Sequence, residues 1–534
     1  MAPCAGARGR LVADRVATMT AMQSIEGLDS WLAWAARAGA AHHSSLQSWL
    51  RCATAAYRTL NACTEGRTDA AAALLTRCTE RVLLQLLKEH SGGWAAGPVD
   101  VGGTRLLLEF RRVPQVVQAP VRLRLASDLS MAAFGGQRYG YPGFGVPLAT
   151  LSSYGGTSPQ AMLQPHSGAF RNLTSWIEPD LRDPHGPLRL VLADPQRTPN
   201  VSVGGCTLTL ARDSSAAYAW AMQVSNLARK GVWGLLGGRQ IRDRVGVFLL
   251  DDYDPAKRPL LMIHGLGSIP LIWAHLTNAV WGSDDLRARY QVWQVVYETD
   301  LPLLAARSRI HEYLQEAWNV LDPGETAPAR TQMVLVGHSL GGVIARLLCV
   351  DSGEGLWNAA FAVPPEALMA SPSDLDKATS VFRFAAHPGI ARAIFLAAPH
   401  RGVSTAIELD HLSSLLIPRR APEVLALRRI ARANPGAIQP TMRRALLQGW
   451  INSVATLQAD HPVRMATELL LPPKNVQYHT IAGVKAGLGK QTDGMVPLDS
   501  AIIPGAESSL VVGGSHHLYD SPEVIAEVVR ILRE

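Results

Sequence analysis

The 534-residue sequence lacks the long apolar segments and the charged runs that mark several classes of protein. No stretch of about 18 uncharged apolar residues occurs, so we predict no transmembrane helix. Charged side chains interrupt residues 1–25, which therefore do not read as a secretory signal as written. No dense run of lysine and arginine is present, and we expect no nucleic-acid partner. The resulting expectation is a cytoplasmic or peripheral membrane location.

Cysteine is also scarce. The six cysteines form no C-x-x-C pair, so we expect no zinc site, and we predict neither a metal nor an organic cofactor. Cys52, Cys63 and Cys78 occur in helix-like sequence, which favours their interpretation as small buried residues. The spacing of the cysteines leaves the redox compartment open.

What the sequence does contain is the composition of a folded protein. Hydrophobic residues make up 47% and charged residues 18%, which is typical of globular domains and excludes a largely disordered chain. The length predicts several domains. The net charge of +7 fits either a mildly basic surface or one that contacts anionic lipid or an acidic substrate, and the oligomeric state stays open.

The first half of the chain divides into parts with different periodicity. Residues 1–95 carry apolar side chains at helical spacing, which predicts a helical N-terminal region that ends at two glycines. Residues 96–212 hold three strand-like runs and are predicted to form a small β-rich domain. Its Gly/Pro/Tyr-rich tract, 135–156, is predicted to form loops. Residues 213–243 are predicted to be a helical connector.

From residue 244 to residue 534, strand-like runs alternate with helical stretches. This alternation predicts an α/β fold, with a mostly parallel sheet, helices on both faces and ligands at the carboxyl ends of the strands. A gap of about 75 residues before the strand-like run 476–482 is too long for a loop. We predict a helical cap insertion at about 402–474, with an extra core layer as the alternative.

One strand-like run, 333–336, leads directly into Gly337-His338-Ser339-Leu340-Gly341 and a helix-compatible stretch. This arrangement resembles the nucleophile elbow of α/β-hydrolases. A serine on so tight a turn needs small neighbours, which the two flanking glycines supply. The alternative is a glycine-rich turn with an incidental serine. We predict that Ser339 is a nucleophile.

A serine hydroxyl becomes reactive only with a base, an acid that orients the base, and donors for the oxyanion. The loop His264-Gly265-Leu266-Gly267 follows a strand-like run, and its glycines allow close approach to a substrate oxygen. We predict that the backbone N–H groups of Leu266 and Leu340 form the oxyanion hole. His264 is expected to be structural, because it precedes the serine and belongs to this loop.

The acid and the base are expected after the serine, in that order. Asp493 follows the strand-like run 476–482 and is the first candidate for the acid; Asp499 is the second, and a turn-forming Asp-Gly without a role is the alternative. His516 and His517 lie between the last strand-like run and the last helix, and the residues alone leave both open as the base. A metal on this pair is not expected, since no second ligand cluster is evident.

Taken together, the chain resembles a bacterial family of lipase-like α/β-hydrolases, similar to the GPI inositol-deacylase and triacylglycerol-lipase groups. The resemblance covers about residues 240–534. The matching segments include the His-Gly-Leu loop, Gly337 to Gly342, Ala398-Pro399-His400-Arg401-Gly402, Thr492-Asp493-Gly494 and Pro522 to Glu534. The family places its histidine six residues before the proline that opens the last helix, which implies His516 as base. It also implies a structural role for His400.

The resemblance implies a serine esterase or lipase that hydrolyses carboxylic esters of acyl chains through Ser339, His516 and Asp493, with an acyl-enzyme intermediate. The expected partner is an acyl-ester or lipid substrate, and peripheral membrane contact is consistent with such a substrate. An acyltransferase or a thioesterase would use the same triad, because the shape of the pocket selects the acceptor. A non-catalytic scaffold, in which the N-terminal helices bind a partner, is the reading from a different class.

Overall fold

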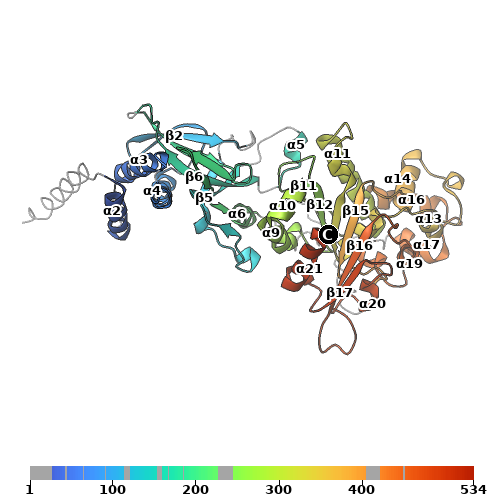
Figure 1. Cartoon of the computed structure of the whole chain (residues 1–534). Helices are drawn as coiled ribbons and strands as arrows, with labels where there is room; N and C mark the ends of the chain where they lie inside the picture. Colours follow the sequence, from blue (N-terminus) through green and yellow to red (C-terminus); the bar gives the residue numbers. More distant parts are fainter. Residues whose placement is uncertain are drawn as a thin grey trace, which may run out of the picture. The chain divides into compact units, whose positions relative to one another are not determined.

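The structure is a computed structural model, and it describes residues 27–41, 45–63, 65–90, 92–113, 121–152, 159–165, 168–183, 186–225, 245–403, 421–448 and 452–534. The chain divides into two compact units, which are described separately below (Figure 1). The first comprises residues 1–153 and 167–223, and the second comprises residues 154–166 and 224–534. Within the described ranges, every helix is too short or too polar to cross a membrane.

The first unit is a layer of helices packed on a mixed sheet. The helices are α2 (Leu28–Ala41), α3 (Leu46–Asn61) and α4 (Thr68–Glu89), as the apolar periodicity predicts. The six-stranded sheet has the order β1-β2-β7-β6-β5-β3, with bounds Gly97–Val101, Thr104–Arg111, Leu188–Ala193, Ala169–Glu178, Val146–Ser152 and Val121–Leu125. The apolar faces of the helices and the sheet bury each other in one hydrophobic core, so the helical and β-rich regions share a single interior.

The prediction of loops over residues 135–156 is wrong for β5. This strand pairs with the edge strand β3 on one side and with β6 on the other. Nearly all of its side chains are buried, so the strand shows no alternation of apolar and polar residues. The glycines and prolines around it favoured the prediction of loops. In the predicted connector, α6 spans Ala216–Val224, and residues 226–243 lie outside the described residues.

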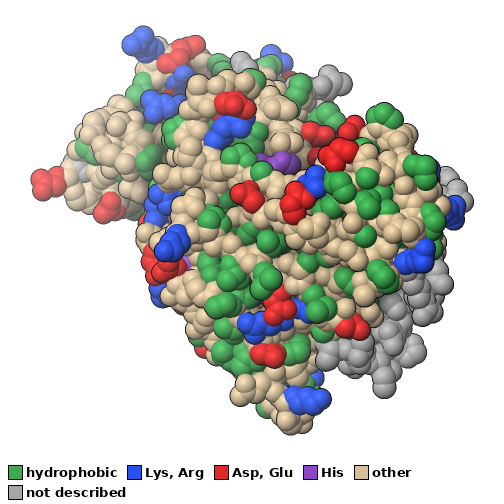
Figure 2. Space-filling model, turned by 90° about the vertical axis from the view of Figure 1, so that its right-hand side faces the viewer, with side chains coloured by type: hydrophobic (Ala, Val, Ile, Leu, Met, Phe, Trp, Pro, Cys, Tyr) green, Lys and Arg blue, Asp and Glu red, His purple; other side chains and the backbone are tan. Residues whose placement is uncertain are grey.

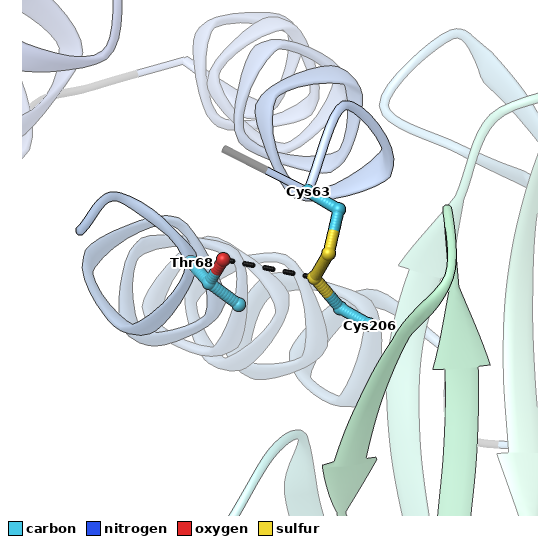
Figure 3. The surroundings of a disulfide bond; sticks show 3 residues. All are labelled: Cys63, Thr68 and Cys206. Atoms are coloured by element: carbon cyan, nitrogen blue, oxygen red, sulfur yellow. Dashed lines mark hydrogen bonds between the residues drawn. A yellow bond between two sulfur atoms is a disulfide. The ribbon is translucent and has the colours of Figure 1, made fainter. Parts of the chain in front are cut away.

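A disulfide bond joins Cys63 and Cys206, so the interpretation of Cys63 as a small buried residue is wrong. Cys63 follows the C-terminal end of α3, and Cys206 begins β9 (Cys206–Thr209), which forms a hairpin with β8 (Asn200–Val203) (Figure 3). The hydroxyl of Thr68, at the start of α4, lies 3.7 Å from the Cys206 sulfur. The bond therefore fixes the helical layer to the hairpin. Cys52 and Cys78 are fully buried, as predicted.

Breaking this disulfide is expected to destabilise the first unit by about 2–5 kcal/mol, because the bond closes a long loop in the unfolded chain. The cysteines are 143 residues apart. A Cys63→Ser, Cys206→Ser double variant should lower the midpoint of the thermal transition of that unit. Reductant should lower the wild-type midpoint by a similar amount and leave the double variant unchanged. A wild-type midpoint that does not respond to reduction would contradict this prediction.

The second unit contains a seven-stranded sheet with the order β11-β13-β12-β14-β15-β16-β17. Its strands are Gly246–Leu249, Tyr290–Val296, Arg258–Ile263, Met333–His338, Ile390–Leu396, Gln477–Val484 and Ser508–Gly513. All neighbours pair in parallel except β11, which is antiparallel to β13. Every residue of β13 and β14 is buried, as expected for strands covered on both faces.

Helices cover the two faces of this sheet. Figure 1 shows α9 (Ala274–Gly282) and α21 (Pro522–Arg533) on one side of it and α14 (Pro372–Phe382) and α16 (Pro422–Ala433) on the other. The other principal helices are α10 (Asp284–Arg289), α11 (Leu303–Leu321), α12 (Leu340–Leu348) and α13 (Gly355–Ala360). Side chains of α11, α12 and α14 share the main hydrophobic core with the strands. The predicted α/β architecture is therefore confirmed, with β14 at the centre of the sheet.

The predicted insertion at 402–474 contains helices α16, α17 (Pro440–Gln448), α18 (Ser453–Thr456) and α19 (Pro462–Glu468). Its residues 404–420 and 449–451 lie outside the described residues. Helix α16 packs against α14, and its apolar side chains join the main core. At α16 the insertion therefore forms an extra layer of core, which is the alternative to a cap. Val403 and Leu457 are residues of the insertion that line the cavity described below.

Figure 2 shows how the charged side chains are distributed on one face of the molecule. On the face drawn in Figure 2, the described lysine and arginine side chains are scattered among acidic ones and do not gather into one patch. The exposed apolar side chains include Met465 and Leu469 of the α19 segment, which are 54% and 86% exposed. Contact with a membrane surface stays a prediction.

Candidate active site

Ser339 occupies the sharp turn between strand β14 and helix α12. Its backbone angles are φ 54° and ψ −124°, a conformation that L-residues rarely adopt and that stores strain. Gly337 and Gly341 make the turn possible. A Cβ on Gly337 would clash with the backbone of Gly341, and a Cβ on Gly341 would clash with the carbonyl oxygen of Ile263 in β12. The turn thus holds the serine hydroxyl at the carboxyl edge of the sheet.

Two residues far away in the sequence lie beside this hydroxyl. His516, in the loop after β17, has its Nε2 atom 2.9 Å from Oγ of Ser339. Its Nδ1 atom is 2.7 Å from Oδ2 of Asp493, which lies in the loop after β16. The structure therefore joins the three predicted residues in one continuous chain of hydrogen bonds.

The carboxylate of Asp493 is fixed by its own loop. It is 3% exposed, and its Oδ1 accepts hydrogen bonds from the backbone N–H groups of Met495 and Val496, at 2.8 and 2.7 Å. Burial alone would raise the pKa of this carboxyl, but the hydrogen bond from His516 and the two backbone N–H groups more than offset it. The pKa of Asp493 is therefore below its usual value, and the group is an anion at neutral pH.

The competing candidates for the base and the acid, His517 and Asp499, make other contacts. His517 is exposed and lines the cavity next to Ser339 that is described below, where its ring lies 5.8 Å from that of Tyr519. Asp499 is exposed, and its carbonyl oxygen accepts a hydrogen bond from Arg401. The geometry thus brings His516 to Ser339 and Asp493 to His516, while the second choices for base and acid make neither contact among the interactions described.

The predicted oxyanion donors flank the serine. Leu340 is the first residue of α12, and N–H groups in the first turn of a helix lack a partner within the helix. Leu266 lines the cavity with Gly265, Gly267 and Ser339. The loop that carries Leu266 is anchored, because the Gly267 N–H donates to the Thr299 hydroxyl at 3.1 Å.

His264 and His400 lie in buried surroundings. His264 is 1% exposed, its Nδ1 lies 3.1 Å from the carbonyl oxygen of Gly265, and its ring packs on Tyr297 at 4.7 Å. Burial lowers its pKa to about 4. His400 is 1% exposed as well; burial, together with Arg346 and Arg401, lowers its pKa well below the usual value. Both side chains are neutral at neutral pH.

A cavity of about 300 Å³ opens next to Ser339 and His516. Its walls are mainly apolar. The apolar side chains include Leu266, Pro399, Val403, Leu457, Met495 and Val496, and the polar ones include His338, His517 and Tyr519. The wall thus combines the loop that carries Leu266, the predicted insertion and the loop that carries Asp493.

Sequence reasoning assigned no role to His338, although it stands beside the serine. It is 4% exposed, and its Nε2 atom lies 2.9 Å from the backbone carbonyl oxygen of His516. Val403, Leu457 and Tyr519 were also not expected at the cavity. Only position in the motif could have drawn attention to His338, because its partner is 178 residues away in sequence.

Within the described ranges, no group of three or more His, Cys, Asp or Glu side chains is arranged to hold a metal ion. The arrangement of Ser339, His516 and Asp493 supports chemistry by its own side chains. A hydroxyl, an imidazole and a buried carboxylate in sequence can transfer a proton away from the hydroxyl and make it nucleophilic.

Comparison with known proteins gives one family and several structural neighbours. The chain is 17% identical to the mature form of the lipase BlEst2 from Bacillus licheniformis, with 54% of this chain and 97% of that chain covered and a TM-score of 0.30. It is 15% identical to the esterase RhEst1 from Rhodococcus sp. ECU1013, with 55% and 96% covered and a TM-score of 0.27. It is 14% identical to the carboxylesterase CesB from Bacillus subtilis, with 54% of this chain and 88% of that chain covered and a TM-score of 0.26. A search of curated protein sequences gives no significant match.

The family match covers the whole arrangement described above. It runs from residue 260 to residue 528, about half of the chain, and spans the loop that carries Leu266, the strained Ser339, Asp493 and His516. The seven-stranded sheet with its antiparallel edge strand and the helices on both faces agree with this match. The chain belongs to the alpha/beta hydrolase family.

Proposed function

We propose that the protein is a serine esterase or lipase that hydrolyses carboxylic esters of acyl chains. Ser339 is the nucleophile, His516 the general base and Asp493 the acid that orients it. The backbone N–H groups of Leu266 and Leu340 are the oxyanion donors. The single observation that supports the proposal most strongly is the chain of contacts from Oγ of Ser339 through both ring nitrogens of His516 to the carboxylate of Asp493.

The reaction follows from this order of groups. His516 Nε2 takes the proton of Ser339 while Oγ attacks the ester carbonyl, and the carbonyl oxygen becomes an anion facing two N–H groups. His516 then gives the proton to the leaving alcohol, which leaves an acyl group on Ser339. A water molecule, deprotonated by His516, attacks this acyl-enzyme and releases the acid. Asp493 stays ionised and stabilises the imidazolium that forms in each half.

An acyl substrate is supported by the lining of the cavity. The side chains of Val403, Leu457, Met495 and Val496 offer an apolar wall close to Ser339. Apolar surface of this kind favours an alkyl chain over a charged group, because removing apolar area from water is favourable at about 25 cal/mol per Å². The proposed substrates are therefore esters whose acyl part is a hydrocarbon chain.

A series of nitrophenyl esters with increasing acyl length tests this function. We expect release of nitrophenol and of free acid in equal amounts, with kcat/KM rising as the chain fills the apolar wall. An acyltransferase would instead pass the acyl group to an added alcohol or thiol in preference to water. No turnover with any ester, and no labelling by a fluorophosphonate, would favour the scaffold.

Replacing Asp493 with Asn is expected to lower kcat by about 10⁴-fold, because the amide neither stabilises the imidazolium nor holds the same tautomer of His516. The side chain keeps its size, so the fold should survive, and circular dichroism checks this. Asp499→Asn is the matched control, since that carboxylate is exposed and has no described contact with His516. If the two variants lost activity equally, the assignment of the acid would be wrong.

A further inference from the structure

A buried imidazole connects the nucleophile to the base by a second route. His338 is the last residue of β14, directly before Ser339, and is 4% exposed. Its Nε2 atom lies 2.9 Å from the backbone carbonyl oxygen of His516. A carbonyl oxygen only accepts, so Nε2 of His338 carries the hydrogen and donates it.

The protonation state of His338 follows from its surroundings. Burial, together with the neighbouring ring of His516, lowers the pKa of His338 to about 3, so the ring of His338 is neutral at neutral pH. With the hydrogen on Nε2, the Nδ1 atom of the neutral ring is bare, and it has no hydrogen-bond partner among the described residues. The side chain thus serves as a single N–H donor without adding a charge next to the base.

The contacts of the ring fix its position. Its ring centroid lies 4.9 Å from that of His516 and 5.0 Å from that of Tyr519, whose ring is nearly perpendicular to it. On the other side it backs onto the oxyanion loop, since a Cβ on Gly265 would lie 3.1 Å from its Nδ1 and 3.0 Å from Cβ of Ser339. Rotating the ring away would therefore require the elbow, the base loop or the oxyanion loop to move.

This hydrogen bond does something that Asp493 does not do. The carboxylate orients the ring of His516 through Nδ1, whereas His338 holds the backbone from which that ring projects. His338 is joined to Ser339 by a peptide bond and to the backbone of His516 by a hydrogen bond. These two links together restrict the distance between the Ser339 hydroxyl and the His516 ring. A reaction of this kind is sensitive to such a distance, and a misplacement of 1 Å can cost about 10²-fold in rate.

We propose that His338 is a positioning residue whose Nε2–H holds the backbone of His516 and so sets the base at the correct distance from Ser339. The inference rests on the proposed roles of Ser339 and His516. It assigns to the second residue of the Gly-His-Ser-Leu-Gly turn a specific task beyond filling space.

Substitutions that separate the donor from the ring test this role. His338→Phe keeps an aromatic ring and removes the donor, and we expect it to lower kcat and the rate constant of fluorophosphonate labelling by about 10²-fold with little change in KM. His338→Gln carries an amide N–H at the reach of Nε2 and should restore most of the activity. His338→Asn, one methylene shorter, should not. The comparison of Gln with Asn decides the question even if the Phe variant fails to fold.

A structural control comes from the same sheet. His479 of β16 is 2% exposed and its Nδ1 lies 2.8 Å from the Ser508 hydroxyl, at the edge of the sheet opposite the cavity. His479→Phe should lower thermal stability and leave kcat per active site unchanged. The loss of kcat in His338→Phe must therefore exceed any change of kcat in His479→Phe. Equal kcat in His338→Phe and wild type, or equal kcat in the Gln and Asn variants, would overturn the proposal. Full activity of Ser339→Ala would instead overturn the proposed function itself.

Discussion

Ser339→Ala is expected to lower kcat for ester hydrolysis by about 10⁶-fold, the scale seen when a triad serine is removed from a hydrolase. The alanine has no oxygen to attack the carbonyl, so no acyl-enzyme forms. The rate that remains should reflect binding and the two oxyanion N–H groups alone. Steady-state kinetics with a short-chain nitrophenyl ester, normalised to folded protein, measures the effect.

The control for this variant is another serine in the same unit. Ser380 lies in α14, is exposed, and donates a hydrogen bond to the backbone carbonyl oxygen of Lys377 in the same helix. Ser380→Ala should keep wild-type kcat and KM. The fold of Ser339→Ala should also persist, because alanine leaves the packing around Gly337 and Gly341 unchanged. A Ser339→Ala variant that retained more than a small fraction of the activity would rule out this serine as the nucleophile.

His516→Ala is expected to cause a loss of the same order, about 10⁶-fold in kcat, because the serine then lacks the group that takes its proton. His517→Ala should cause no comparable loss, since its ring is exposed and has no described hydrogen bond to Ser339. The two variants differ by one position in the loop after β17, so they share most effects on folding. Burst and steady-state rates with the same ester, measured in parallel, separate them.

The His516 and His517 variants should differ strongly in activity, because only His516 is hydrogen-bonded to Ser339 among the described contacts. The distance of 2.9 Å from Nε2 to Oγ belongs to His516 alone among the described contacts. Additive imidazole should restore part of the activity of His516→Ala, because it can enter the space left by the ring. If His517→Ala were the inactive variant, the loop would have to adopt another conformation during the reaction.

Much of the hydrolase fold could be predicted from the sequence, because its strands are fully buried and read as short apolar runs. The run 333–336 lies within β14, and the run 290–297 covers β13. Ser339 was recognisable because the steric demands of the elbow are compressed into five residues. Chain order made Asp493 the first candidate for the acid, with Asp499 second, because that order is a property of the topology.

The parts that could not be predicted depend on contacts between distant residues. Residues alone left His516 and His517 open, since neighbouring side chains in a loop differ only in direction. The pairing of Cys63 with Cys206 depends on the tertiary structure and cannot be deduced from the spacing of the cysteines in the sequence. Strand β5 and the buried position of His338 were missed for the same reason, because each is defined by what packs against it.

The disulfide also bears on the compartment. Disulfide bonds form and persist mainly in oxidising environments and are rare in the cytosol. The bond between Cys63 and Cys206 therefore weighs against the expectation of a cytoplasmic location. Trapping free thiols in the protein as it is isolated from its native cells would show whether the pair is oxidised there.

The central claim is that the hydroxyl of Ser339 is activated by its neighbours, and the most direct test is covalent capture. Wild-type protein should react with a fluorophosphonate at one site per chain, and peptide mass spectrometry should find the phosphonyl group on Ser339. Labelling should fall steeply in His516→Ala and in Asp493→Asn. An unmodified protein, or an adduct on a different residue, would contradict the account.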